Sequence, residues 1–286
     1  VIKGLFKAGD HVLISSMEHN AVMRPLTQLL NEDITFDTIP CDTTGSIKLD
    51  AIESLIRPNT VAIIINHASN VCGTIQPVKG IGIICKEHNL HFIVDAAQTA
   101  GIMPIDVKES QIDALCFTGH KGLLGPQGIG GMILTKEMAQ ALTPLIAGGT
   151  GSFSHLETMP TNMPDAFESG TLNLPGIIGL NEGLAFIESK GMENIHNHEL
   201  ALTEAFLKGL RPIDGINIIG KQNVQDRTAV VSITIDGADA ASVAYELEST
   251  YHIMTRVGLH CAPRAHQTLG TYPEGTVRFS LSLIHI

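Results

Sequence analysis

Short, β-rich apolar runs alternate with helical patterns along this chain, and this alternation constrains the fold more than any other feature. VAIIINH (61–67) is almost continuously apolar, and HVLISS (11–16) and HFIVDAA (91–97) are similar. Continuous apolar strands separated by helices are typical of a mainly parallel sheet covered on both faces. Right-handed crossovers bring the carboxyl ends of such strands to one sheet edge, where ligands bind. We therefore expect an α/β fold.

The first part of the chain is predicted to be the larger of two domains, residues 1–185. An irregular segment rich in Gly, Ser, Thr and Pro is expected at 148–174. Before it, strands are expected at 11–16, 34–40, 61–67, 91–97, 114–119 and 131–135, and helices at 20–31, 50–57 and 79–89.

The rest of the chain, residues 186–286, is predicted to form a smaller α/β domain. A helix should begin at Pro175, since proline is favourable in a first helical turn, and run to about Lys190. After it, helices are expected at 192–210 and 239–250, and strands at 216–220, 229–236 and 276–280.

Composition excludes several classes of protein. Of 286 residues, 44% are hydrophobic and 16% charged, which is typical of a globular and not a disordered chain. The net charge of −11 without a basic cluster argues against a nucleic-acid partner, and no apolar run is long enough for a membrane span. Five scattered cysteines without a C-x-x-C pair indicate reduced thiols in a cytoplasm. No metal site is expected.

Both ends of the sequence are unusual. VIKGLFKAGD begins inside a helical pattern that nothing caps, which predicts that an N-terminal segment is absent. LSLIHI (281–286) follows the strand-like VRFS and is what a sequencing-library adapter encodes when translated. We expect those six residues not to be native.

Asp95 and Lys121 carry the strongest chemical signal. Asp95 follows four apolar residues in VDAAQTAG, and a carboxylate there must be paired. Lys121 lies between a His and a Gly in FTGHKGLLGP. This arrangement suits pyridoxal phosphate (PLP), because the carboxylate can pair with the pyridinium nitrogen and the amine can form a Schiff base. The alternatives are a helix N-cap for Asp95 and an ordinary loop position for Lys121.

Further motifs extend the pattern over nearly the whole chain: SSMEHNAV (15–22), HASNVCGTIQPV (67–78), FESGTLNLPGIIGL (167–180) and RVGLHCAP (256–263). With VDAAQTAG and TGHKGLLGP, these motifs resemble the class V aminotransferase family of fold-type I PLP enzymes, within it the cysteine desulfurases and selenocysteine lyases. The resemblance implies a large domain with a mainly parallel sheet of the seven-stranded type and a smaller C-terminal domain.

The resemblance also implies how PLP would be held. His19 would stack on the ring and assist proton transfer, and Gln98 would bond the ring hydroxyl. Gly170 and Thr171 would reach the phosphate of a partner subunit, which implies a homodimer. The ligands it assigns to PLP are Lys121, Asp95, Gln98, His19, Asn70, Thr118, His120, Gly170 and Thr171, and a further phosphate loop would lie before Val1. His67, Glu18 and Asn20 are interpreted as supporting residues.

Three residues bear on the substrate. Arg278 resembles the main clamp for an α-carboxylate, Arg256 a second position and Asn70 a third group beside it, and a guanidinium offers the matching fork.

Cys261 lies in a polar loop near His260 and Arg256, where a thiol can be held as thiolate. In the desulfurases a cysteine there takes sulfur from the substrate. The alternative is an unreactive loop cysteine.

The sequence thus favours a PLP-dependent cysteine desulfurase, a sulfurtransferase that converts L-cysteine to L-alanine. A persulfide on Cys261 would pass to an acceptor, such as an iron–sulfur scaffold, a tRNA-thiolation protein or a carrier. Selenocysteine lyase, aminotransferase and epimerase remain alternatives within the family. An inactive fragment or a non-enzymatic α/β binding module is the alternative of another class.

Overall fold

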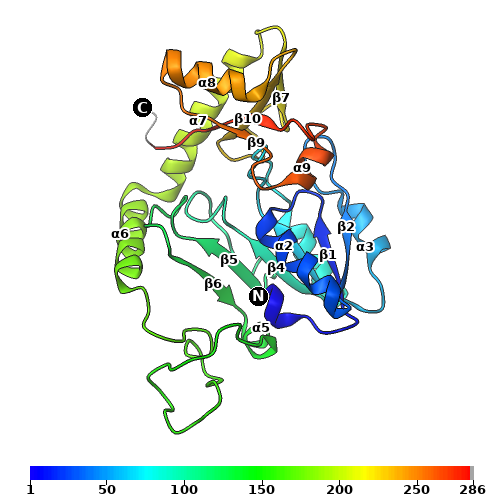
Figure 1. Cartoon of the computed structure of the whole chain (residues 1–286), viewed down its shortest axis with the longest axis vertical. Helices are drawn as coiled ribbons and strands as arrows, with labels where there is room; N and C mark the ends of the chain where they lie inside the picture. The colour runs from blue at the N-terminus through cyan, green and yellow to red at the C-terminus, as the bar shows by residue number, and fades with distance from the viewer. Residues whose placement is uncertain (284–286) are drawn as a thin grey trace.

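The larger sheet has six strands in the order β2-β1-β3-β4-β5-β6 in a computed structural model that describes residues 1–283 (Figure 1). The first five strands are parallel, and β6 runs antiparallel to β5. They are β1 (His11–Ser15), β2 (Thr35–Ile39), β3 (Thr60–Asn66), β4 (His91–Asp95), β5 (Ala114–Thr118) and β6 (Gly130–Leu134). The predicted α/β class and mainly parallel sheet are confirmed.

Alternating side chains of β3 show why the sheet is covered on both faces. Ile63 and Ile65 pack into one buried apolar cluster, and Ala62 and Ile64 pack into another. The first cluster includes Val78 and Ile81 of α4, and the second includes several residues of α2. The helices and 3-10 turns of this region are α1 (Ile2–Leu5), α2 (Asn20–Leu29), η1 (Leu30–Glu32), η2 (Leu49–Ala51), α3 (Ile52–Leu55), α4 (Val78–Glu87) and α5 (Lys136–Ala141).

A second, four-stranded sheet has the order β7-β8-β10-β9 and is antiparallel throughout. Its strands are β7 (Ile216–Ile219), β8 (Val230–Ile235), β9 (Arg256–Gly258) and β10 (Thr276–Ser280). It packs with α7 (Met192–Leu210) and α8 (Ala240–Tyr251), and α9 (Pro263–Thr268) follows β9. Side chains of α7, β8 and β10, among them Leu207, Val231 and Val277, form its core.

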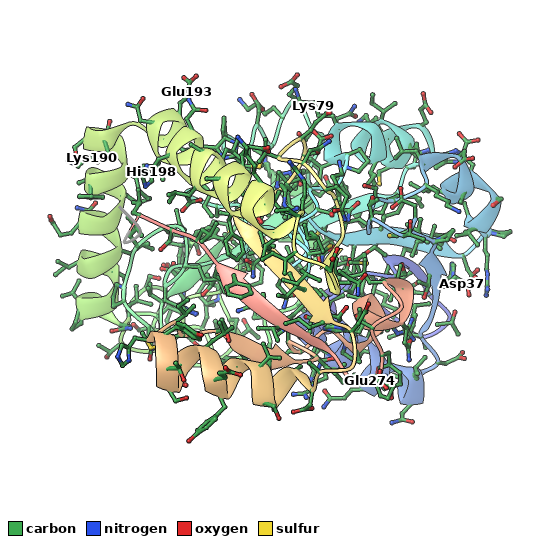
Figure 2. The ribbon with its side chains drawn as sticks, turned by 90° about the horizontal axis from the view of Figure 1, so that it is seen from above. Asp37, Lys79, Lys190, Glu193, His198 and Glu274 are labelled. Atoms are coloured by element: carbon green, nitrogen blue, oxygen red, sulfur yellow. The ribbon has the colours of Figure 1, made fainter. Side chains whose placement is uncertain are left out.

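A long helix, α6 (Leu174–Lys190), leads from the first sheet toward the second (Figure 1). It meets α7 at Gly191, whose φ of +82° allows the sharp change of direction seen from above in Figure 2. Lys190 and Glu193 mark this corner. The predicted boundary at residue 185 would fall within α6, and it stays a prediction.

The structure differs from the sequence predictions in the strand count of the larger sheet and in three short elements. The sheet of the described residues has six strands, not seven, because only six segments of this region have paired, extended backbone. Three short elements, α5, β9 and α9, were not predicted. Their lengths of three to six residues give too little periodicity to recognise, although the Thr135 side chain caps α5 by accepting from Met138 N. Of LSLIHI, residues 284–286 lie outside the described residues.

Within residues 1–283, no helix is long and apolar enough to cross a membrane. All five cysteines have free thiols, and Cys261 is exposed.

Candidate active site

A cavity of about 330 Å³ lies at the carboxyl edge of β1, β3, β4 and β5. The sheet topology explains why residues far apart in sequence meet there, since the parallel strands that lead to them all end at this edge. Predicted site residues that line this cavity are His19, Asn70, Asp95, Gln98, Thr118, His120 and Lys121.

The loops that carry Asp95 and Lys121 are held together by a close backbone approach. A Cβ on Gly101, which has a φ of +83°, would come within 2.4 Å of the Gly122 carbonyl oxygen. A Cβ on Gly122 would come within 2.7 Å of the Ala100 carbonyl oxygen. Only glycine at both positions allows the two loops to touch, so the glycines of VDAAQTAG and GHKG bring the carboxylate and the amine to one cavity.

Asp95 ends β4 and is half-buried. One carboxylate oxygen, Oδ1, accepts a hydrogen bond from Ala97 N at 2.9 Å, which is its one hydrogen bond among the described residues. Residues 97–102 form turns, so Asp95 does not cap a helix. A half-buried carboxylate with one internal partner has capacity left to bind a ligand.

Lys121 lines the cavity and is exposed. Partial burial lowers the pKa of its amine, Asp95 opposes that shift, and Arg278 and Arg256 reinforce it. A lowered pKa increases the neutral fraction of the amine, and the neutral form is the nucleophile and proton acceptor.

His19 is the N-cap of α2, where its Nδ1 accepts a hydrogen bond from Ala21 N at 3.0 Å. This bond leaves the proton on Nε2 when the ring is neutral. Burial lowers the pKa of His19, Asp95 raises it, and Lys121 lowers it again. The imidazole is therefore predominantly neutral near pH 7 and has a fixed orientation.

Thr118 and His120 flank the lysine loop and pair with each other, since Thr118 Oγ1 and His120 Nδ1 lie 2.8 Å apart. Both face the cavity of Lys121. A hydroxyl and an imidazole beside an amine form a donor set suited to a phosphate.

Asn70, in the loop after β3, connects the cavity to residues of the second sheet. Asn70 Nδ2 donates to the His260 carbonyl at 2.7 Å, and Arg278 Nη1 donates to the Asn70 carbonyl at 3.0 Å. Asn70 Oδ1 and Arg278 Nε are nevertheless buried without a hydrogen-bond partner among the described residues. Buried polar atoms are normally paired, so two orphans on contacting residues indicate a polar ligand there.

Arg256 and Arg278 lie directly opposite each other on β9 and β10. Burial lowers the pKa of Arg278, Arg256 adds to that shift, and Cys261 opposes it. Two adjacent guanidinium groups repel each other, and a carboxylate between them would relieve that repulsion.

Cys261 is exposed on the loop after β9, and its carbonyl accepts from Asn20 N at 2.8 Å. His260 and Cys261 both have left-handed backbone, with φ values of +48° and +60°. Two consecutive non-glycine residues in this region are a local strain, which is often found at functional loops.

The expectation that His260 helps to hold the Cys261 thiolate is wrong. The His260 ring is buried, and its Nε2 lies 2.9 Å from Thr276 Oγ1. Burial lowers its pKa to about 3, and Arg278, His266 and Arg256 contribute to the shift. A neutral ring supplies no positive charge, whereas Arg278 interacts electrostatically with Cys261.

Gly170 and Thr171 are not part of this cavity. Both are exposed, in a segment without helix or strand that extends away from the second sheet (Figure 1). Gly170 N donates to Gly149 O at 2.7 Å. Their predicted contact with a partner's phosphate stays a prediction.

Sequence reasoning missed Asn66, at the end of β3, and the burial of Glu18, which was interpreted only as supporting. Asn66 also lines the cavity, and Glu18 contacts Asn66 while completely buried. The available signals were a polar residue ending an apolar strand and a Glu directly before His19. A second cavity of about 370 Å³, lined by Gln98, Lys121, Glu199 and Arg278 among others, was also missed.

Comparison with known proteins identifies the family. Residues 1–285 match the family model of the class V aminotransferases, so the chain belongs to this family. Membership implies PLP as the general cofactor, and the fold-type I class is confirmed.

Relatives within the family are cysteine desulfurases. The chain is 33% identical over 279 residues to the "Probable cysteine desulfurase" of Methanothermobacter thermautotrophicus, covering 96% of this chain and 69% of that protein. It is 34% identical over 283 residues to a protein of the same name from Pyrococcus abyssi, covering 98% and 69%.

A solved structure shows the same architecture. The apo cysteine desulfurase of Thermococcus onnurineus superposes with a TM-score of 0.91 at 32% identity, covering 100% of this chain and 72% of that one. The chain therefore spans about two thirds of the length of these relatives.

Proposed function

We propose that this protein is a PLP-dependent cysteine desulfurase that converts L-cysteine to L-alanine. The observation that carries the proposal is the single cavity that joins an exposed amine of lowered pKa, Lys121, to the under-bonded carboxylate of Asp95. Around it, the orphaned atoms Asn70 Oδ1 and Arg278 Nε and the exposed Cys261 thiol supply the groups that a cysteine substrate needs.

The residues fit PLP on their own chemistry. Lys121 would hold the aldehyde carbon, Asp95 the protonated ring nitrogen and Gln98 the ring hydroxyl, while His19 would stack on the ring. Thr118 and His120 would bind the phosphate. When bound, PLP supplies an electron sink that stabilises negative charge on an amino-acid substrate.

The protein's own groups then perform the remaining work. Arg278, with Arg256 opposite and Asn70 beside it, would bind the substrate carboxylate and orient the thiol toward the loop of Cys261. The neutral amine of Lys121 would accept the Cα proton, and His19 would assist proton transfer through Nε2.

Sulfur transfer requires no external oxidant. The Cys261 thiolate attacks the sulfur of the substrate, so a sulfur–sulfur bond forms while the carbon–sulfur bond breaks. The electron pair of that bond stays with the substrate carbon, which takes up a proton and leaves as alanine. A persulfide remains on Cys261 and would pass its outer sulfur to a thiol of an acceptor protein.

We further propose a homodimer that acts in the cytoplasm. The support for a second subunit is a set of large apolar side chains exposed on α6 and the segment before it, among them Leu145 (74%), Ile146 (71%) and Leu174 (60%). This area is where Gly170 and Thr171 lie, so a partner would meet the phosphate ligands that the resemblance predicts.

Cys261→Ala tests the proposal. The variant is expected to form no alanine from cysteine while the visible absorbance of bound PLP is unchanged, because the thiol accepts sulfur and does not hold the cofactor. Cys116→Ala is the matched control, since that half-buried thiol is on β5 and should be dispensable. Undiminished alanine formation by Cys261→Ala would refute the mechanism.

Two further measurements separate the alternatives. Relative rates on cysteine and selenocysteine distinguish a desulfurase from a selenocysteine lyase. A purified protein that gains no visible absorbance with added PLP would favour a non-enzymatic binding module.

A further inference from the structure

Glu18 is a fully buried carboxyl group three residues after β1 ends and one residue before His19. Its Oε1 accepts hydrogen bonds from Ser15 Oγ and from Asn66 N, the latter at 2.9 Å. Its Oε2 is buried and has no partner among the described residues. No Lys, Arg or His of residues 1–283 forms an ion pair with it. A buried carboxylate without a cation is costly when ionised.

The Asn66 side chain supplies independent evidence for the state of this carboxyl. Asn66 Nδ2 donates to the Met17 carbonyl at 2.9 Å, which fixes the amide orientation. Asn66 Oδ1 is then a second buried acceptor without a partner, on a residue already in contact with Glu18. Two buried acceptors on contacting residues are thus without a donor, and a proton on Glu18 Oε2 would add a donor to this site.

Asp95 lies close to this pair. Asn66 and Asp95 are register partners on β3 and β4, and Asp95 acts electrostatically on Glu18. Burial raises the pKa of Glu18 to about 8, the hydrogen bonds from Ser15 and Asn66 lower it, and Asp95 raises it further. Two neighbouring carboxyl groups in a poorly solvated site do not both ionise readily, and environment decides which one carries the charge.

The other titratable groups around Glu18 do not compensate a charge. Burial raises the pKa of the Cys41 thiol to about 11, so this group is neutral. Burial lowers the pKa of His67 to about 4, and it lowers the pKa of His19 as well, so both rings are predominantly neutral. Asp95 is therefore the charged group that would repel an ionised Glu18.

We propose that Glu18 is a positioning residue that stays protonated and neutral in the folded protein, so that Asp95 is the charged member of this pair of carboxyl groups. As a neutral donor and acceptor it joins the end of β1 to the end of β3 through Ser15 and Asn66, and it fixes the start of α2 at His19. The use of that single charge to pair with a pyridinium nitrogen rests on the proposed function.

The first test is the stability of the cofactor-free protein as a function of pH, compared with Glu18→Gln. A group whose folded pKa is raised contributes stability that is complete below its unfolded value of 4.5 and is lost as pH rises toward the folded value of about 8. In this window the unfolding constant of the native protein is expected to rise by about tenfold per pH unit relative to Glu18→Gln. Parallel profiles for the two proteins would overturn the proposal.

An infrared measurement on the unmutated residue covers the case in which Glu18→Gln does not fold. A carbonyl band of a protonated carboxyl group is expected near pH 7 and should disappear above about pH 8. Burial raises the pKa of Glu199 to about 7, so the experiment is done in a Glu199→Gln background. If no such band is present near pH 7, the proposal fails.

Titration with PLP separates this proposal from the proposed function. Glu18→Gln is expected to bind PLP within about threefold of the native affinity, because glutamine resembles the neutral acid, whereas Glu18→Ala should bind more than about tenfold more weakly through loss of two hydrogen bonds. Equal binding by all three proteins would refute the positioning role. If the native protein itself does not bind PLP, the proposed function fails, and the pH profile still decides the state of Glu18.

Discussion

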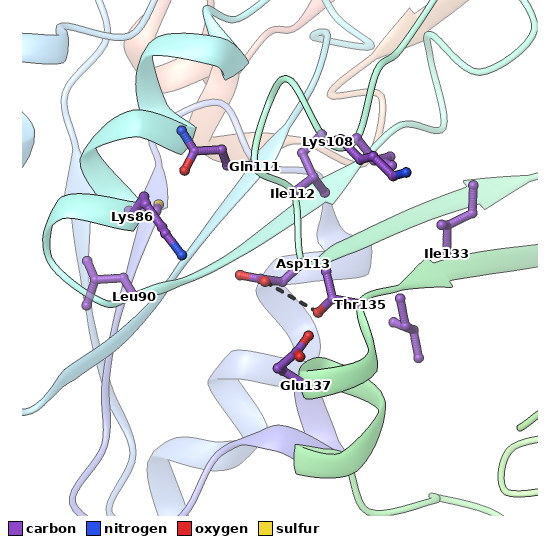
Figure 3. Close-up of a pocket in the computed structure, with 12 residues that line it drawn as sticks. Lys86, Leu90, Lys108, Gln111, Ile112, Asp113, Ile133, Thr135 and Glu137 are labelled. Carbon is purple, nitrogen blue, oxygen red and sulfur yellow. Dashed lines mark hydrogen bonds between the residues drawn. The ribbon is translucent and has the colours of Figure 1, made fainter. Parts of the chain in front are cut away.

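Two cavities lie at opposite edges of the larger sheet, and their size is a poor guide to their role. The cavity at Lys121 measures about 330 Å³, and the one at the amino ends of β4 and β5 measures about 610 Å³ (Figure 3). The larger one is lined by charged residues as well, including Lys86, Lys108, Asp113 and Glu137.

The hydrogen bonding of Asp95 and Asp113 shows how the two cavities differ. Asp113 accepts hydrogen bonds from Phe92 N at 2.8 Å and from Thr135 Oγ1 at 3.4 Å, and His91 Nδ1 lies 3.8 Å away. Figure 3 shows the bond to Thr135. Both oxygens of Asp113 are thus satisfied by its own fold, whereas Asp95 has one internal bond. An under-bonded carboxyl beside an amine indicates ligand binding, and a fully bonded one indicates a structural role.

The largest expected effect is on the lysine of the smaller cavity. Lys121→Ala should lower alanine formation from cysteine by at least about 10³-fold, because it removes both the cofactor anchor and the proton acceptor. Lys108→Ala, in the larger cavity, should stay within about twofold of the native rate, as expected for an exposed lysine. After borohydride treatment with PLP, mass spectrometry should locate the label on Lys121. A label elsewhere, or equal rates for the two variants, would remove the distinction between the cavities.

Substitution of Asp95 should lower mainly activity, whereas substitution of Asp113 should lower mainly stability. Asp95→Asn is expected to lower activity by about 10²-fold, with a change in the free energy of unfolding of less than about 1 kcal/mol. Asp113→Asn should keep activity and lower the free energy of unfolding by about 1–3 kcal/mol, since it disturbs a satisfied hydrogen-bond group. Denaturant unfolding and alanine assays on both variants measure this. Similar losses of activity in the two proteins would contradict the comparison.

The sequence was sufficient to predict where the strands end, but not which polar side chains around those ends are buried. Apolar runs predict β1, β3 and β4, and the parallel topology then brings His19, Asn70, Asp95 and Lys121 together. These positions follow from local pattern plus a general rule of sheet topology.

Burial of single polar side chains could not be predicted in this way, because it depends on contacts between distant positions. Burial lowers the pKa of His260, with Arg278 contributing from eighteen positions later. Glu18 meets Asn66 across 48 positions. The residues next to His260 and Glu18 in the sequence do not indicate these contacts. The neutral state of both groups could therefore be inferred only from the structure.

The smallest expected effect is the contribution of Asp113 to stability at acid pH. Stability from Asp113 is lost as pH falls, whereas stability from Glu18 is lost as pH rises. Burial raises the pKa of Asp113, but the nearby His91 ring and the hydrogen bond from Phe92 N outweigh this and hold the pKa below its ordinary value of 3.8. Asp113 therefore contributes stability that is present above pH 3.8 and is lost as pH falls through its folded pKa. The contribution is modest because the side chain is 28% exposed and partly screened by water. Thermal unfolding below about pH 4 should show the native protein losing stability faster than Asp113→Asn, and an equal decline would mean that its hydrogen bonds do not favour the ionised form.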